Sequence, residues 1–293
     1  MPDNGRLTIL FVLNPISGGV PKSEIESFIN QYTKERNIEY EIFHTTGSHD
    51  KESVKHWIKS INPDRVVAVG GDGTLKLVAE VLIGSDIPIG IIPAGSANGM
   101  AKELELPTDV EECMEMIVKG NSERIDVISI NNNDICLHLS DIGMNAQLVK
   151  YFEDRGLRGK LGYARGVLRM LWRRLLLQVT ISDGHNKIER NAFMVVLANA
   201  RMYGTGAMIN PDGDLQDGIF EVIVIRRLTI FALVKMFFRK EKFSSRFIEI
   251  LPAHSVNIHV RKKAYFQVDG EYKGKTKSIH AEVKKHALSI IKP

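Results

Sequence analysis

Residues 65–76 read Arg-Val-Val-Ala-Val-Gly-Gly-Asp-Gly-Thr-Leu-Lys, and this stretch decides the fold of the first part of the chain. Its β-branched run predicts a buried strand, and its glycines predict a tight loop. The apolar spacing that follows (Leu75, Val78, Ala79 and Leu82) predicts a helix. In such a loop Gly70, Gly71 and Gly73 let backbone N–H groups approach an anion, and the helix dipole favours negative charge at the same point.

The first 125 or so residues alternate strand and helix patterns, which predicts a parallel sheet with crossover helices. We expect capping boxes at Ser23–Glu26 and Thr108–Glu111 to begin two of the helices. The expected strands are residues 7–13, 39–45, 65–69 and 88–92. Three of them end in Gly-rich segments, and the carboxyl edge where these segments must meet is where open parallel sheets bind ligands.

These three segments together predict a nucleotide phosphate site, although each alone could be a structural turn. They supply backbone N–H groups, the hydroxyls of Thr74 and Ser96 and the amide of Asn98. A bare phosphate would repel Asp72, so we interpret that residue as a ligand for a metal ion or a metal-bound water. The spacing matches neither a Walker A loop nor the dinucleotide Gly-x-Gly-x-x-Gly. The candidate residues in these segments are Asn14, Pro15, Ile16, Ser17, Gly18, Gly70, Gly71, Asp72, Gly73, Thr74, Leu75, Lys76, Ser96 and Asn98.

After Arg124 the pattern becomes mostly antiparallel β, with helical insertions expected near residues 145–172 and 228–250. We therefore predict two domains, 1–124 and 125–293, with a cleft between them. The expected strands and hairpins of the second domain are residues 125–130, 134–139, 179–182, 188–198, 219–225, 256–260, 264–268, 279–283 and 288–291.

Composition places the chain among ordinary globular proteins: of its 293 residues, 44% are hydrophobic and 25% charged. The longest apolar run, residues 228–238, is interrupted by Lys235 and is shorter than the ~18 residues that span a bilayer. The first residues lack the features of a signal peptide, so we expect a cytoplasmic protein. Cys113 and Cys136 lie in apolar patterns, which favours burial over a disulfide.

Positive charge is concentrated in two segments, Arg155–Arg174 and Arg226–Arg246, each with seven Lys or Arg residues. Such segments could contact an anionic membrane surface or nucleic acid, or be solvated faces. Residues 228–238, flanked by basic residues, could form an interfacial helix or a helix packed in the core. We expect no nucleic-acid partner, because the sequence contains no recognised module. A homodimer is compatible with the sequence, which does not specify the oligomeric state.

The motifs Asn14–Gly18, Gly70–Thr74 and Pro93–Asn98 resemble those of the diacylglycerol kinase-like lipid kinases, which include bacterial diacylglycerol kinases and sphingosine and ceramide kinases. The resemblance continues along nearly the whole chain in the order expected of the family. The further motifs are Asp141–Ala146, Asn199–Gly206, Pro211 with Asp217-Gly218, and Val268–Glu271.

The resemblance implies a Rossmann-like α/β domain of the NAD kinase/diacylglycerol kinase type followed by an antiparallel β-sandwich. It implies transfer of the γ-phosphoryl group of ATP to the hydroxyl of a membrane lipid such as diacylglycerol, in the interdomain cleft. It assigns Asn14–Gly18, Thr45, Gly70–Lys76 and Ser96 to ATP and implies that Glu271 acts as general base. Asp72, which could hold Mg²⁺ through water, is the second predicted catalytic residue. It places Mg²⁺ on Asp217 and the backbone oxygens of Asp214 and Ile219. Ser96 stands where threonine is usual, and the hydroxyl is kept.

Two alternative functions remain at this level, beside a nucleic-acid binder, which the basic segments would permit. NAD kinase also uses a Gly-Gly-Asp-Gly loop. In that family an Asn-Glu pair that binds the NAD ribose follows soon after the loop, whereas this chain has Pro93–Asn98 instead. A non-catalytic regulator that binds nucleotide or lipid could keep the fold, although Asp72 and Glu271 are both present. Taken alone, Glu271 would be the acid of an Asp-Gly hairpin turn. A lipid kinase also needs reversible membrane attachment.

Overall fold

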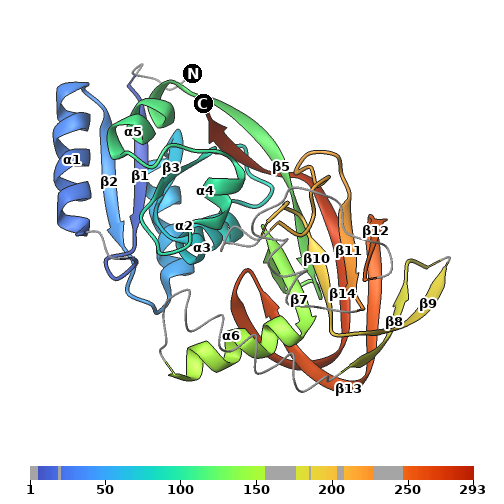
Figure 1. Ribbon diagram of the computed structural model, residues 1–293. Helices are drawn as coiled ribbons and strands as arrows, with labels where there is room; N and C mark the ends of the chain where they lie inside the picture. The colour runs from blue at the N-terminus through green and yellow to red at the C-terminus, as the bar shows by residue number, and fades with distance from the viewer. Residues whose placement is uncertain (1–5, 19–20, 156–175, 185, 203–207, 227–246) are drawn as a thin grey trace. The chain divides into compact units, whose positions relative to one another are not determined.

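The computed structural model describes residues 6–18, 21–155, 176–184, 186–202, 208–226 and 247–293 (Figure 1). The chain divides into two compact units: unit 1 comprises Met1–Ile125 with His286–Pro293, and unit 2 comprises Asp126–Lys285. The predicted division placed the last eight residues in the second domain. They belong to unit 1 because Ile290 pairs in parallel with Ile89 of its sheet.

Unit 1 is built on parallel strands in the order β2-β1-β3-β4, where β1 is Thr8–Leu13 and β2 is Glu39–His44. β3 is Arg65–Gly70 and β4 is Ile89–Pro93. The central strands β1 and β3 are buried along nearly their whole length, as expected for a parallel sheet covered on both faces. The expected α/β organisation is therefore confirmed, with strand ends within a residue or so of those predicted.

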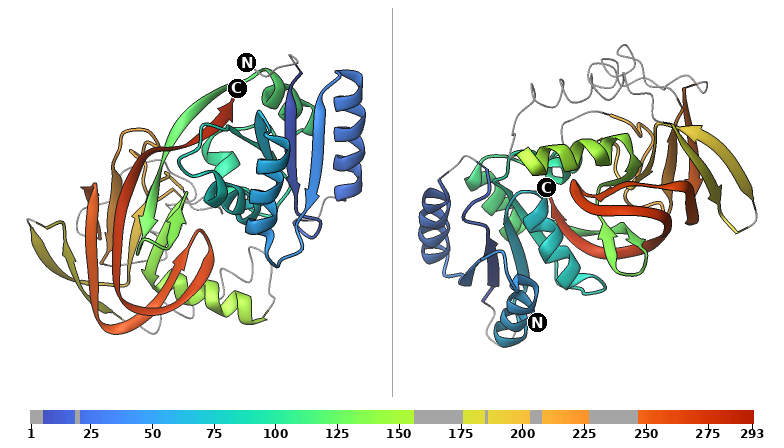
Figure 2. Two further views of the ribbon diagram at one scale, coloured as in Figure 1. Left: turned by 180° about the vertical axis from the view of Figure 1, so that it is seen from behind. Right: turned by 90° about the horizontal axis from the view of Figure 1, so that it is seen from below.

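Helices cover both faces of this sheet (Figures 1 and 2). α1 (Lys22–Glu35) packs against α5 (Val110–Lys119), and the hydroxyl of Tyr32 donates a hydrogen bond of 2.6 Å to Glu115. α2 (Asp50–Ile61) packs against α3 (Asp72–Leu82) through the ion pair of Lys51 and Glu80. Right-handed crossovers explain this, because the chain reverses its direction across the sheet after β2. A short helix, α4 (Gly99–Glu103), follows β4.

The predicted capping boxes are wrong in detail. Pro21 stands at the N-cap of α1 and makes no side-chain cap, so Ser23 does not have the expected role. α5 is capped by Asp109, whose carboxylate accepts hydrogen bonds from the N–H groups of Glu111 and Glu112, instead of by Thr108. Either residue type can serve as a cap, and the local backbone selects the aspartate one position later.

Unit 2 is an antiparallel β structure in which the order β12-β11-β10-β7-β13-β14 forms the main path. β8 and β9 extend from β13, and β5 pairs with β6 and β14. This confirms the expected antiparallel second half. The bounds are β5 Asn121–Ile130, β6 Asp134–Cys136, β7 Leu139–Gly143, α6 Met144–Arg155, β8 Leu177–Ser182, β9 Lys187–Ala192, β10 Met194–Ala198, β11 Phe220–Ile225, β12 Ile248–Ala253, β13 Ser255–Val268 and β14 Glu271–Lys292.

Several expected elements of unit 2 differ from those observed. The predicted strands 256–260 and 264–268 are one strand, β13, with an irregularity in its pairing between His259 and Ala264. The predicted strands 279–283 and 288–291 are likewise parts of the single long β14. Part of the predicted helical segment 228–250 is instead β12, which pairs with β11. The rest of that segment, through residue 246, lies outside the described residues, as do residues 156–175.

Two further expectations can be compared with the structure. Cys113 and Cys136 are both buried and free, as predicted, and burial raises the pKa of the Cys113 thiol to about 12. Across the described residues, no helix is both long enough and apolar enough to span a bilayer. Most of the basic segments 155–174 and 226–246 lies outside those residues.

Candidate active site

The strand order of unit 1 creates a topological switch point at the carboxyl ends of β1 and β3. From β1 the chain leads to β2 on one side, whereas β3 lies on the other. Connections leave these two strands toward opposite faces, so a crevice forms there in folds of this type. The loop after β1 (residues 14–18) lies at this point, and so do residues 71–74, which follow β3 and include the first turn of α3. We call them the first and second loops, and residues 94–98, which follow β4, the third loop.

The first and third loops meet at one backbone oxygen, the carbonyl of Ala94. The hydroxyl of Ser17 donates to it at 3.3 Å, and the ammonium of Lys22 donates to it at 2.9 Å. Gly18 has a φ of +60°, and a Cβ there would lie 2.4 Å from the same oxygen. Only glycine therefore allows the two loops to approach this closely.

The second and third loops are in contact through two glycines. A Cβ on Gly95 would lie 2.3 Å from the Cα of Gly71. Asn98, in the left-handed region at φ +50°, accepts a hydrogen bond from the N–H of Gly95 at 2.9 Å and donates one to its carbonyl at 3.0 Å. Together with the Ala94 contacts, this brings the three loops predicted to bind nucleotide to one edge of the sheet.

Asp72 has a structural contact that the sequence did not indicate. Its two carboxylate oxygens accept hydrogen bonds from the N–H groups of Gly99 and Met100, at 3.0 and 3.1 Å, and so cap the start of α4. A carboxylate has about four acceptor positions, so two remain for water or a metal-bound water. The same side chain thus fixes the third loop relative to the second and keeps acceptor capacity.

The first turns of α3 carry buried polar side chains. The hydroxyl of Thr74 is buried and has no hydrogen-bond partner among the described residues, which fits a residue that awaits a ligand or water. Lys76, two residues further along α3, is only 3% exposed. By contrast Ile16 in the first loop is 84% exposed, and Gly73 and Ser96 are exposed as well.

Lys22 is a candidate that the sequence reasoning missed. It is 7% exposed, and burial lowers the pKa of its ammonium group. A buried cation beside two Gly-rich loops suits an anionic ligand. Its position four residues after Gly18, at the first turn of α1, is the signal that could have identified it.

Thr45 lies at the same edge, because its N–H donates to the carbonyl of Leu13 at the end of β1, at 2.9 Å. The turn after it is held by Asp50, whose carboxylate accepts hydrogen bonds from the N–H groups of Thr46 and Gly47 at 2.9 and 2.8 Å. Burial raises the pKa of Asp50, but these hydrogen bonds outweigh it and leave the pKa below its usual range.

In unit 2, Glu271 follows the two-residue turn that joins β13 to β14. Asp269 and Gly270 have φ values of +51° and +85°, as a type I′ hairpin turn requires, and Val268 pairs with Glu271. Asp269 also connects the turn to the segment between β6 and β7. Its carboxylate accepts hydrogen bonds from the N–H groups of Leu137 and His138, at 3.0 and 2.9 Å.

A buried polar network supports this turn from below. Gln267, 1% exposed, accepts a hydrogen bond from the N–H of Gly270 at 2.7 Å and donates one to Asp141. Asp141, also 1% exposed, accepts further hydrogen bonds from the amide of Asn145 at 2.6 Å and the N–H of Ala146 at 2.8 Å. Such a satisfied buried network holds the turn in one geometry.

A lysine pairs with the carboxylate of Glu271. Lys273 contacts Glu271 at 3.0 Å and Asp134 at 2.8 Å. Burial lowers the pKa of Lys273, but the hydrogen bonds and charges of Asp134 and Glu271 outweigh it and raise the pKa. This contact could not be predicted from the sequence, because Asp134 lies far from the turn along the chain.

The residues predicted to hold Mg²⁺ lie in the loop before β11. Asp217 accepts a hydrogen bond from the N–H of Ile219 at 3.0 Å, and Asp214 accepts one from Gln216 at 2.9 Å. Burial raises the pKa of the neighbouring Glu221, and the charges of Asp217 and Asp212 raise it further. Exposed oxygen donors in acidic surroundings fit the hard donors that Mg²⁺ prefers.

That site rests on one carboxylate and two backbone oxygens. The described part of the chain contains no cluster of three or more His, Cys, Asp or Glu side chains able to hold a metal ion. The absence of such a cluster therefore does not bear on the predicted site.

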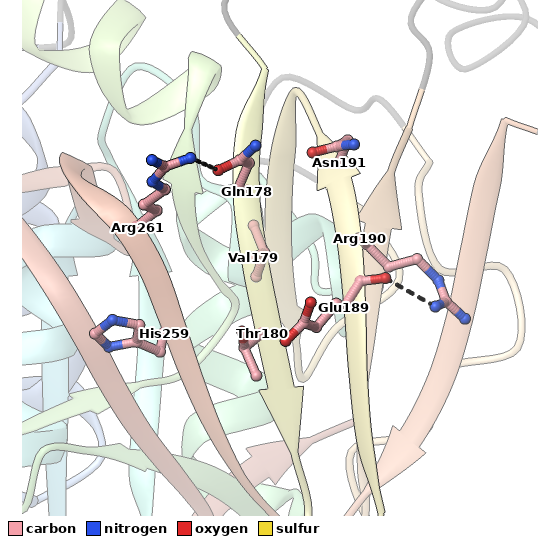
Figure 3. Close-up of a pocket in the computed structure, with 8 residues that line it drawn as sticks. All are labelled: Gln178, Val179, Thr180, Glu189, Arg190, Asn191, His259 and Arg261. Carbon is pink, nitrogen blue, oxygen red and sulfur yellow. Dashed lines mark hydrogen bonds between the residues drawn. The ribbon is translucent and has the colours of Figure 1, made fainter.

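A separate open groove of about 460 Å³ lies on β8, β9 and β13 (Figure 3). Gln178, Thr180, Glu189 and His259 are among the residues that line it, and Arg261 donates a hydrogen bond to Gln178 at 2.9 Å. The groove is polar and open, and no predicted site residue lines it. We therefore do not place the active site there.

The comparisons with known proteins agree with this geometry. Residues 8–130 match the family described as diacylglycerol kinase catalytic domain, and residues 141–292 match the YegS C-terminal NAD kinase beta sandwich-like domain. A diacylglycerol kinase of Mycobacterium tuberculosis is 28% identical over 241 residues, covering 80% of this chain and 77% of that protein. A diacylglycerol kinase of Bacillus subtilis is 27% identical over 224 residues, covering 72% of each.

Solved structures show the same fold. A diacylglycerol kinase from Bacillus anthracis superposes with a TM-score of 0.75 at 19% identity, covering 98% of this chain and 97% of that one. An NAD kinase from Archaeoglobus fulgidus in complex with ATP gives a TM-score of 0.55 at 16% identity, covering 97% and 93%. With the two domain matches, the chain belongs to the bacterial diacylglycerol kinase and YegS-like lipid kinase family.

Proposed function

We propose that the protein is an ATP-dependent kinase that transfers the γ-phosphoryl group of ATP to the hydroxyl of a lipid such as diacylglycerol. The single observation that carries this proposal is the convergence of three Gly-rich loops at the switch point of unit 1. Membership of a lipid kinase family supports it. The acceptor lipid itself follows only from the names of relatives that are about 28% identical or less.

In this proposal the loops of unit 1 bind the triphosphate. Phosphoryl transfer requires mainly that the reactants be positioned and that the developing charge be neutralised. The backbone of Gly71 and Gly95, which have no side chain to obstruct a phosphate, supplies close approach. The hydroxyl of Thr74 and the ammonium of Lys22 supply polar contacts, while Asp72 keeps the second and third loops together.

Unit 2 supplies the base. A lipid alcohol is a poor nucleophile, and a carboxylate within hydrogen-bond reach accepts its proton as the new P–O bond forms. Glu271 fits this role because it is exposed at the end of a hairpin whose turn is fixed by the Asp269 and Gln267 contacts. The ammonium of Lys273, 3.0 Å from this carboxylate, helps to hold it in position.

Magnesium has two proposed positions. At Asp217, with the backbone oxygens of Asp214 and Ile219, it would stabilise the loop before β11. At the nucleotide, Asp72 would hold the ion through water, and the bound ion would neutralise phosphate charge. We further propose a cytoplasmic protein that attaches reversibly to membranes, since its acceptor resides in a bilayer.

The test is turnover with γ-labelled ATP and a whole-cell lipid extract, followed by identification of the labelled product. Glu271→Gln should lower turnover by roughly 10²–10⁴-fold, which is the usual contribution of a general base. Asp72→Asn should also abolish transfer, with folding checked by circular dichroism. Near-wild-type turnover by either variant would refute the role assigned to that residue.

The same assay separates the rival functions. Labelling of NAD in place of lipid would establish an NAD kinase. Binding of ATP without turnover on a broad lipid panel would indicate a non-catalytic regulator. The contacts of Lys22, Ser17 and Asp72 are compatible with nucleotide binding in each case. Only the identity of the labelled acceptor therefore distinguishes these functions.

A further inference from the structure

We propose that an exposed basic bulge of β13, together with Leu176, docks the protein on an anionic lipid bilayer. We call this surface the bulge surface and define it as Leu176, Arg261, Lys262 and Lys263. This inference deepens the proposed function and rests on it, because a kinase whose acceptor lies in a bilayer must reach the membrane. It does not use the segments 155–174 and 226–246, in which the sequence concentrates positive charge.

The bulge brings three cations to the surface in succession. His259 pairs with Ser278 and Ala264 pairs with Thr276, so five steps along β13 correspond to two along β14. A regular strand would turn every second side chain toward the core. Here Arg261, Lys262 and Lys263 are all exposed, because the extra residues leave the ladder with β14.

An apolar pocket lies directly beside these cations. Its volume is about 220 Å³, and Lys262 and Lys263 form part of its wall. The other described lining residues are apolar or uncharged, and they include Leu176, Leu177, Phe193 and Tyr265; none of them is acidic. Cations at the edge of an apolar hollow match the two parts of an anionic lipid, its phosphate and its acyl chain.

Leu176 adds an exposed apolar side chain to the same surface. It is 51% exposed and belongs to a small set of large hydrophobic residues that are exposed in the described residues. In the sequence it also follows closely on the basic segment 155–174. An exposed leucine next to lysines is typical of surfaces that insert shallowly into the interface of a bilayer.

The positive charge of the bulge surface has a defined border. Arg261 is held by its hydrogen bond to Gln178, and the groove beyond it contains the acidic Glu189 (Figure 3). Nucleic acid would also attract the three cations, but its backbone offers no partner for Leu176 or for the apolar pocket. The chemistry therefore favours an anionic bilayer.

The experiment is co-sedimentation with vesicles of phosphatidylcholine containing about one third phosphatidylglycerol, at low and at physiological salt. The double variant Lys262→Gln/Lys263→Gln should bind about thirtyfold more weakly at low salt, which equals two contributions of roughly 1 kcal/mol each. Leu176→Ser should weaken binding by about tenfold, with little dependence on salt, because its contribution is apolar burial.

The matched control is Lys55→Gln/Lys59→Gln, which removes two exposed lysines from α2 in unit 1. It should bind the vesicles as the wild type does. Equal losses in both double variants, no loss in either, absence of wild-type binding, or retention on single-stranded RNA but not on vesicles would each overturn the proposal.

Turnover on acceptor lipid dispersed in detergent micelles separates this inference from the proposed function. The bulge variants should keep wild-type turnover there, because none of the four residues belongs to the proposed catalytic or nucleotide-binding set. If wild-type protein phosphorylates lipid in micelles but does not bind vesicles, the docking surface fails and the kinase stands. If the wild-type protein binds vesicles but phosphorylates no lipid, the docking surface stands and the proposed kinase activity fails.

Discussion

Substituting Asp269 with asparagine tests whether the hairpin turn that carries Glu271 is held by its side chain. Asparagine tolerates the left-handed backbone at φ +51°, so the change leaves the turn conformation unstrained. It replaces one carboxylate oxygen with an NH₂ group that cannot accept. One of the hydrogen bonds from Leu137 and His138, at 3.0 and 2.9 Å, is therefore lost. A hydrogen bond to a charged group contributes about 1.5–3 kcal/mol.

Hydrogen exchange of the Leu137 and His138 amides measures this loss locally, without assuming that the two units unfold together. The expected acceleration is roughly ten- to a hundredfold at one or both amides, since about 1.4 kcal/mol corresponds to a factor of ten. Amides of β10, which pair with β7 and β11, should exchange as in the wild type. Turnover should fall because Glu271 loses its support. Unchanged exchange at both amides would show that the reasoning about this turn is wrong.

Four other substitutions test further contacts of the structure. Lys273→Gln removes the cation beside Glu271 and should lower kcat by about fivefold with KM for ATP unchanged, since a partly exposed ion pair contributes up to roughly 1 kcal/mol; a KM effect alone would contradict it. Gly95→Ala should separate the second and third loops and destabilise unit 1 by roughly 1–3 kcal/mol, with weaker ATP binding by titration. In the free protein Gly73→Ala should leave the melting temperature unharmed, because its Cβ meets nothing within 4 Å. Hydrogen bonds from Lys119 and Tyr32 lower the pKa of Glu115 to about 2, below the ordinary 4.5, so its contribution to stability is present above pH 4.5 and lost as the pH falls toward 2. The melting temperature of Glu115→Gln should accordingly fall less than that of the wild type over this range, and parallel curves would count against the assignment.

The strands of unit 1 could be predicted almost residue by residue, because periodicity and glycine position are local properties. Elements of unit 2 were harder to delimit. Nothing in the apolar pattern of β13 distinguishes one irregular strand from two short ones, since the bulge depends on pairing with β14. The capping boxes failed for a related reason: several residues near a helix start can cap it, and the path of the incoming chain selects among them.

Residue types and short spacings were sufficient to predict an α/β part followed by an antiparallel β part, the three Gly-rich loops, and Asp72 and Glu271 as candidate site residues. These depend on residue type and short spacing, which a chain carries before it folds. Three features became visible only in the folded chain: Lys22 and Ser17 share the carbonyl of Ala94, Asp72 caps α4, and Lys273 joins Glu271 to Asp134. The physical reason is that these contacts join residues distant along the chain, and their geometry is fixed by the packing of whole elements.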